Sequence, residues 1–216
     1  MKRSACRSVV PLLLGFAAAC TAVVASADPI FESISPVPHT YVEGVDFDLM
    51  MYTGLGDVTA PVAAVDIILS PQPVASNTST SGCEAADFAG FPAGDLALIQ
   101  RGTCTFLQKA LNAQAAGASG VIIFNEGNPG RTDLIAGTLG TPGLINIPVI
   151  GTTFAVGQTF GNFITNGSFP TGFVARLEIS ADDLPAVNVP EPATLALLGV
   201  GLAGIGFARR RNRSTR

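Results

Sequence analysis

The chain has 216 residues, of which 48% are hydrophobic and 13% charged, with 24 Gly, 15 Pro and no Trp. This composition favours one β-rich domain with many loops over a helical bundle. Residues 28–208 hold all 16 acidic residues but only 4 of the 12 basic ones, a net charge of −12. A surface this acidic repels phosphate backbones, which excludes nucleic acid as a partner.

Residues 1–27 have the three parts of a secretory signal peptide. Lys2 and Arg3 follow Met1, an apolar run extends from Val9 to Ala19, and small residues precede the cleavage predicted after Ala27. A membrane helix that stays on the protein is the alternative interpretation. Export and removal of both ends would leave about 160 residues, enough for one well-buried core.

The first part of the exported region predicts strands and turns. Apolar residues at 47–52 and 62–69 are typical of strands, and turns are expected at Gly54–Asp57 and at Ala60-Pro61. The polar stretch from Ser70 to Gly82 predicts an exposed loop.

Residues 96–124 predict a parallel β-α-β unit. Leu96–Gln100 and Val121–Phe124 have the apolar composition of buried strands. Between them, Thr105 and Gln108 have the spacing of a capping box, and the alanine-rich helix that they begin is expected to end at Gly117.

The loop at 125–131 is the predicted binding surface. It follows the carboxyl end of a strand in a parallel sheet, where ligands commonly bind. The candidate contact residues are Asn125, Glu126, Asn128 and Arg131.

The remainder of the domain, which we place at 28–180, predicts two strands and a short helix. Strands are expected at 147–150 and at 174–179, where apolar and polar residues alternate. Thr152 or Thr153 is expected to cap a helix that runs through Phe160. Asp182-Asp183, the only adjacent pair of acidic residues, lies in a linker at 181–188 and is expected to be solvated.

Residues 189–216 have three parts: Val189-Pro190-Glu191-Pro192, an uncharged run at 193–208, and the cluster Arg209, Arg210 and Arg211. Sixteen helical residues span about 24 Å, which is short for a bilayer core of about 30 Å but sufficient with local thinning. The arginines would stay in the cytoplasm, so the domain would lie outside. A buried core helix is the alternative.

This tail resembles the PEP-CTERM sorting signals that exosortases recognise. The resemblance implies cleavage near Pro190–Pro192, an inner-membrane anchor that is only transient, and release to the cell surface or an exopolysaccharide matrix. Gly199, Gly201 and Gly204 have the G-x-G-x-x-G spacing of a dinucleotide-binding motif. The required second strand cannot follow in so few residues, so we assign these glycines to helix packing and expect no cofactor.

Four cysteines are present, and Cys6 and Cys20 belong to the signal peptide. Cys83 and Cys104 remain as a pair in an oxidising compartment, so a disulfide is expected. Two free thiols and a metal-binding pair are the alternatives, although neighbouring residues do not complete a metal site.

Catalytic groups are scarce. His39 is the only histidine, which excludes an H-E-x-x-H zinc motif and leaves one candidate for any Ser-His-Asp triad. We interpret His39 as an exposed loop residue, and we expect no catalytic residue, no metal and no enzymatic activity.

Four segments resemble the protease-associated (PA) domain, most closely the version in secreted aminopeptidases; they are 82–88, 101–109 (R-G-T-C-T-F-L-Q-K), 113–118 and 147–151. The resemblance implies an α+β, β-rich fold, a β-sandwich or open barrel with flanking helices, without catalytic residues of its own. Because about ten residues separate the domain from the sorting signal, we expect no peptidase domain.

Together these features predict a non-catalytic exported module. Its partner would be an extracellular protein or a matrix ligand, in addition to the secretion machinery and the exosortase. The alternative is an accessory subunit that controls substrate access to a separate secreted protease.

Overall fold

The structure is a computed structural model that describes residues 28–69, 78–165 and 172–184. The predicted signal peptide and the predicted sorting signal with its membrane helix lie outside these ranges. Within them, no helix is long and apolar enough to cross a membrane.

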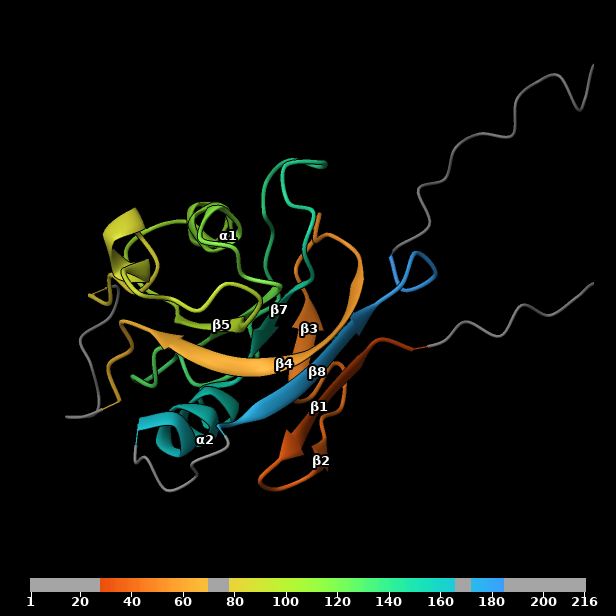
Figure 1. The fold of residues 1–216 in the computed structure, drawn as a ribbon, viewed down its shortest axis with the longest axis horizontal. Coiled ribbons are helices and arrows are strands. Elements are labelled where there is room, and N and C mark those ends of the chain that lie inside the picture. Colours follow the sequence, from red (N-terminus) through yellow and green to blue (C-terminus); the bar gives the residue numbers. More distant parts are fainter. Residues whose placement is uncertain (1–27, 70–77, 166–171, 185–216) are drawn as a thin grey trace, which may run out of the picture.

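The described residues form one eight-stranded sheet in the order β2-β1-β8-β4-β5-β6-β7-β3, with α1 and α2 on its two faces (Figure 1). The strands are β1 (Ile30–Ser35), β2 (His39–Thr40), β3 (Phe47–Leu49), β4 (Gly56–Val65), β5 (Leu96–Gln100), β6 (Gly120–Phe124), β7 (Val149–Thr152) and β8 (Val174–Ile179). The helices are η1 (Ala85–Phe88), α1 (Phe106–Ala115) and α2 (Phe154–Thr165).

The sheet is antiparallel at one end and parallel in its centre. β2, β1, β8 and β4 pair antiparallel, β4 to β7 pair parallel, and β3 closes the far end antiparallel to β7. β4 connects the two parts because its first six residues pair with β8 and its last four with β5.

The turn predicted at Ala60-Pro61 is wrong, since both residues lie within β4. Pro61 pairs with Val174 at the end of the β8 ladder, and the ladder to β5 begins only at Val62. The missing N–H of the proline is tolerated at this change of partner, as it is at strand boundaries generally.

The β-α-β unit is confirmed at 96–124. β5 and β6 pair parallel, and Thr105 caps α1 by accepting a hydrogen bond from the Gln108 N–H at 3.2 Å. The capping box is only half formed, because the Gln108 side chain donates to Asn112 Oδ1 at 2.9 Å.

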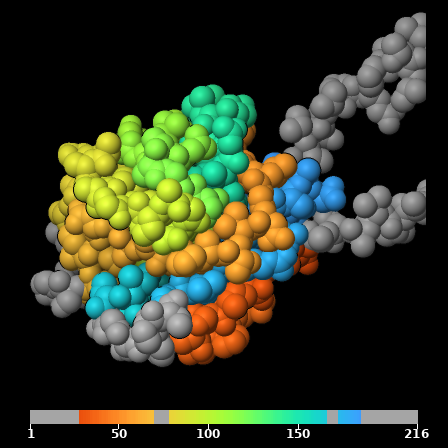
Figure 2. Space-filling view, viewed as in Figure 1, coloured from red at the N-terminus to blue at the C-terminus, as the bar shows by residue number. Residues whose placement is uncertain are grey.

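The two central strands are buried on both faces. Leu96 and Leu98 pack into one core with α2, while Ala97 and Ile99 pack into a second core with α1. The space-filling view places the two helices on opposite sides of the strands (Figure 2). Two-sided burial explains why β5 is apolar without the alternation seen in β8.

The sheet curls into a half-barrel, so the open-barrel prediction describes it better than the sandwich. The Phe31 ring of β1 lies 5.5 Å from the Phe47 ring of β3, although the two strands are near opposite ends of the sheet. Phe160 of α2 lies 5.6 Å from the Phe31 ring and fills the concave side.

The strand predicted at 147–150 begins two residues later, as β7. Thr152 belongs to β7, and Thr153 is the residue that caps α2 by accepting a hydrogen bond from the Val156 N–H at 3.3 Å. α2 lies against β6 so closely that a Cβ atom at Gly157 would be 2.0 Å from Cγ of Phe124.

We predict that Gly157→Ala lowers the free energy of unfolding. Alanine favours helix by about 1 kcal/mol over glycine, but the clash with Phe124 forces the helix away from β6, and overpacking of this kind costs about 1–3 kcal/mol. Urea denaturation measures the change. The matched variant Thr159→Ala, at an exposed position of the same helix, should remain within about 0.5 kcal/mol of the wild type.

Candidate functional site

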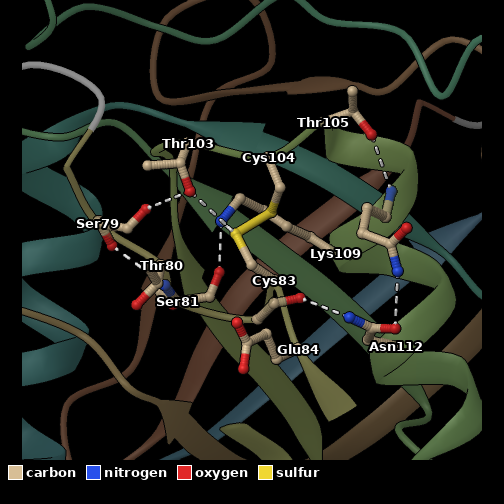
Figure 3. Close-up of a disulfide and its surroundings, with 12 residues drawn as sticks. Ser79, Thr80, Ser81, Cys83, Glu84, Thr103, Cys104, Thr105, Lys109 and Asn112 are labelled. Carbon is tan, nitrogen blue, oxygen red and sulfur yellow. Dashed lines mark hydrogen bonds between the residues drawn. A yellow bond between two sulfur atoms is a disulfide. The ribbon is translucent and has the colours of Figure 1, made fainter. Parts of the chain in front are cut away.

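Cys83 and Cys104 form the expected disulfide, with an S–S distance of 2.09 Å and a Cα–Cα distance of 5.7 Å. It joins the segment before η1 to the turn between β5 and α1 (Figure 3). Closing a loop of this length restricts the unfolded chain and contributes about 3 kcal/mol to stability.

Lys109 of α1 is fully buried beside the disulfide. Its Nζ donates a hydrogen bond to the Ser81 carbonyl and lies 3.6 Å from Sγ of Cys83 (Figure 3). Burial lowers the pKa of Lys109 to about 8, against the opposing effect of the Asp87 and Glu126 carboxylates. This lysine therefore anchors the disulfide-linked segment to α1 from within the core.

The end of the predicted exposed loop at 70–82 is buried, which corrects the expectation for its described residues. Ser79 and Ser81 are covered, and the Ser81 hydroxyl donates to the Val65 carbonyl while it accepts a hydrogen bond from the Gln100 N–H. The segment lies so close to the β5–α1 turn that a Cβ atom at Gly102 would be 1.8 Å from the Ser79 carbonyl oxygen.

A cavity of about 300 Å³ opens beside this turn. Its lining combines two guanidinium groups, an aromatic ring and hydroxyl groups, from Arg101, Gly102, Cys104, Thr105, Phe106, Arg131 and Thr138. The volume is at the lower end of the range of about 300–1,000 Å³ for small-molecule sites.

Arg101 is the chemically distinctive residue of the cavity. Its guanidinium lies 5.7 Å from the centre of the Phe106 ring and makes no hydrogen bond or ion pair with the residues that the structure describes. Burial lowers the pKa of Arg101, the charge of Arg131 lowers it further, and Glu126 opposes both. The group remains a cation at neutral pH and is suited to bind a carboxylate.

The predicted binding loop at 125–131 contributes one residue, Arg131, to the cavity. The other three candidates, Asn125, Glu126 and Asn128, are buried, so they are not available as exposed contacts. Their groups stabilise the loop: Asn125 Nδ2 donates to the Asp133 carbonyl at 2.8 Å, and Glu126 forms an ion pair with Arg131 at 3.6 Å. A buried carboxylate needs such a partner.

Arg101 was not among the candidate residues predicted from the sequence, although the structure places it in this cavity. The position at the carboxyl end of a parallel strand, which indicated the loop after β6, also applies to Arg101. This residue follows the carboxyl end of β5, the parallel neighbour of β6. The neighbouring strand ends bring Arg101 and Arg131 to one cavity.

The remaining candidates lie apart from this cavity or outside the described ranges. His39 is exposed, as expected, but it belongs to the edge strand β2 rather than to a loop, and its ring lies 4.7 Å from that of Tyr41. Asp183 is partly buried and accepts a hydrogen bond from the Ser180 N–H at 2.5 Å. The sorting residues Val189, Pro190, Glu191 and Pro192 and the cluster at 209–211 are not described.

No group of three His, Cys, Asp or Glu side chains that could hold a metal ion occurs within residues 28–69, 78–165 and 172–184.

Comparison with known families identifies two parts of the chain. Residues 58–160 match the PA domain, and residues 188–211 match the PEP-CTERM protein-sorting motif.

Comparison with individual proteins finds peptidases. An aminopeptidase of Pseudomonas aeruginosa is 57% identical over 120 residues, which cover 55% of this chain and 22% of the relative. Signal peptide peptidase-like 4 of Oryza sativa subsp. japonica is 34% identical over 109 residues, 50% of this chain and 18% of the relative. The chain thus spans about a fifth of the length of these relatives.

A solved aminopeptidase from Aneurinibacillus sp. strain AM-1 superposes with a TM-score of 0.53 at 24% identity. The superposition covers 72% of this chain and 31% of the aminopeptidase chain, and it supports the fold.

We predict that Lys109 makes stability rise with pH above about pH 8. Its pKa is lower in the folded state than the ordinary value of 10.5, so between these values the unfolded chain binds more protons. The free energy of unfolding of the wild type minus that of Lys109→Met should therefore increase from pH 8 towards pH 10. Urea denaturation across this range measures it, and a constant difference would contradict the buried, perturbed lysine.

Proposed function

Because residues 58–160 form a PA domain and residues 188–211 carry a PEP-CTERM protein-sorting motif, we propose that this protein is an exported, non-catalytic binding module. Its ligand is an extracellular polypeptide or matrix component that carries a carboxylate. An exosortase processes the tail, so that the membrane anchor is transient and the domain reaches the cell surface or the surrounding matrix.

The guanidinium of Arg101, which has no hydrogen-bond or ion-pair partner within the described part of the chain, is the observation that carries this proposal. Residues 28–208 contain only four basic residues, and two of them, Arg101 and Arg131, line one cavity of an otherwise acidic domain. Arg131 forms an ion pair with Glu126. Arg101 lies over the Phe106 ring, and its hydrogen-bond donors have no acceptor among the described residues. A ligand carboxylate would bind Arg101, and an apolar group beside it would contact the Phe106 ring.

A second candidate function is an accessory subunit of a separate secreted protease. The identity of 57% to part of an aminopeptidase of Pseudomonas aeruginosa favours it. Surface residues that the two proteins share would allow this chain to contact a peptidase. Affinity capture from the secreted fraction separates the two candidates. A peptidase as the main captured protein supports the accessory role, and a different polypeptide or a matrix glycan supports the first.

We predict that Arg101→Met abolishes carboxylate recognition. The probe is a dye-labelled Ala-Phe-Ala-Phe peptide with a free C-terminal carboxylate, compared with its C-terminal amide by fluorescence anisotropy. The wild type should bind the carboxylate form at least about tenfold more tightly, because a charge-assisted hydrogen bond contributes about 1.5–3 kcal/mol. Arg176→Gln removes an equal charge from β8 and should leave binding unchanged. Equal binding of both peptides would contradict the proposed site.

We predict that replacing Arg209, Arg210 and Arg211 by glutamine impairs sorting. The variant keeps only Arg213 and Arg216, so the apolar run at 193–208 loses three of the five positive charges that favour a cytoplasmic end. Cell fractionation and the mass of the released protein measure the outcome. The variant should be released unprocessed or degraded, and normal processing would show that the tail does not act as proposed.

A further inference from the structure

The outer edge of β3 is the end of the sheet, since β3 pairs only with β7 among the described strands. The ladder places Met50 opposite Val149, with the Met50 N–H donating to the Val149 carbonyl, and the Thr153 N–H donating to the Asp46 carbonyl. In an antiparallel pair, alternate residues hydrogen-bond to the partner strand. The backbone N–H and C=O groups of Asp46, Asp48 and Met50 therefore point towards β7. The residues that alternate with them direct their backbone N–H and C=O groups away from β7.

Two of these outward-facing residues already have partners. Phe47 is bonded by the chain's own turn, where the Gly44 N–H donates to the Phe47 carbonyl at 2.8 Å. Met51 pairs with the segment 137–139, donating to the Gly137 carbonyl at 2.9 Å and accepting from the Leu139 N–H at 3.0 Å.

Leu49 lies between Phe47 and Met51, and its backbone N–H and C=O have no partner among the described residues. The edge therefore has a gap one residue wide.

A cavity of about 590 Å³ runs along this gap. Apolar surface is exposed in it, because Met51 is 53% exposed and Tyr52 41% exposed. Its acidic lining is Glu43, Asp48 and Asp183. Burial raises the pKa of Glu43, and the nearby carboxylates of Asp48 and Asp183 raise it further, which shows that the negative charges are concentrated.

We propose that this groove, the β3 edge, binds an extended polypeptide segment carrying lysine or arginine, which adds a short strand at Leu49. An unpaired strand edge is a template for main-chain hydrogen bonds, and alternate side chains of the added strand would enter the groove. The three carboxylates select cationic side chains, and Met51 and Tyr52 contact the apolar residues between them.

This site is distinct from the Arg101 cavity and does not rest on the proposed function. The two cavities share Thr138 but carry opposite charge, so they select different groups. β3 and Asp183 also lie outside residues 58–160, the part that matches the PA domain.

The test measures binding of dye-labelled acetyl-(Val-Lys)₃-amide to the full-length chain by fluorescence anisotropy. The double variant Glu43→Gln/Asp48→Asn should weaken binding at least fivefold. Asp95→Asn, which removes a carboxylate next to β5, and Arg101→Met should leave it unchanged. A peptide with an N-methyl group on every residue should bind at least tenfold more weakly, because it cannot donate a main-chain hydrogen bond to the Leu49 carbonyl.

Hydrogen exchange of the Leu49 amide tests directly whether the peptide pairs with this residue. Exchange should be fast in the free protein and slow when the peptide is bound. Unchanged exchange, or equal binding of the N-methylated peptide, would overturn strand addition. If the amide is already protected and exchanges quickly only after removal of residues 185–216, the chain's own C-terminal segment occupies the edge, and the assignment to a separate partner is overturned.

Discussion

The structure depends on the burial of two parallel strands on both of their faces. Every residue of β5 and β6 is covered, and alternate side chains of each strand enter two separate apolar cores. Since apolar burial stabilises by about 25 cal/mol for each Å², strands buried on both faces contribute more per residue than strands with one solvated face. The arrangement requires a cover on each side, which α1 and α2 supply (Figure 1).

The central strands are packed with apolar side chains on both faces, so the two cavities lie at the strand ends and at the sheet edge. Arg101 and Arg131 follow β5 and β6, where the parallel strands end, and the acidic groove follows the outer edge of β3. The charged residues that do lie inside, Lys109 and Glu126, are engaged with the Ser81 carbonyl and with Arg131. Their contacts stabilise the segments around the Arg101 cavity.

Two cavities of opposite charge thus meet at Thr138, one with guanidinium groups and one with carboxylates. Residues 28–208 carry a net charge of −12 and attract cations over most of their surface, so a local positive site gains specificity by contrast with its surroundings. This combination agrees with the proposed binding role. The fold is the part that the chain has in common with a solved aminopeptidase, of which it covers 31%.

The sequence by itself determined the elements whose signals are local. The helix from Thr105, the alternating strand at 174–179 and the β-α-β unit follow from capping groups and periodicity, which act over a few residues. The pairing of Cys83 with Cys104 followed from their number and from export. Only the tertiary structure decided which polar residues are buried, because that depends on the distant segment that covers them.

For this reason Glu126 was predicted to be a contact residue, whereas it is buried and pairs with the Arg131 side chain. Lys109 is likewise buried, and its ammonium group bonds to the distant segment at 79–83. The change of partner within β4 is likewise a property of strand order, as is the lack of a backbone partner for Leu49 among the residues that the structure describes. Neither periodicity nor capping encodes strand order.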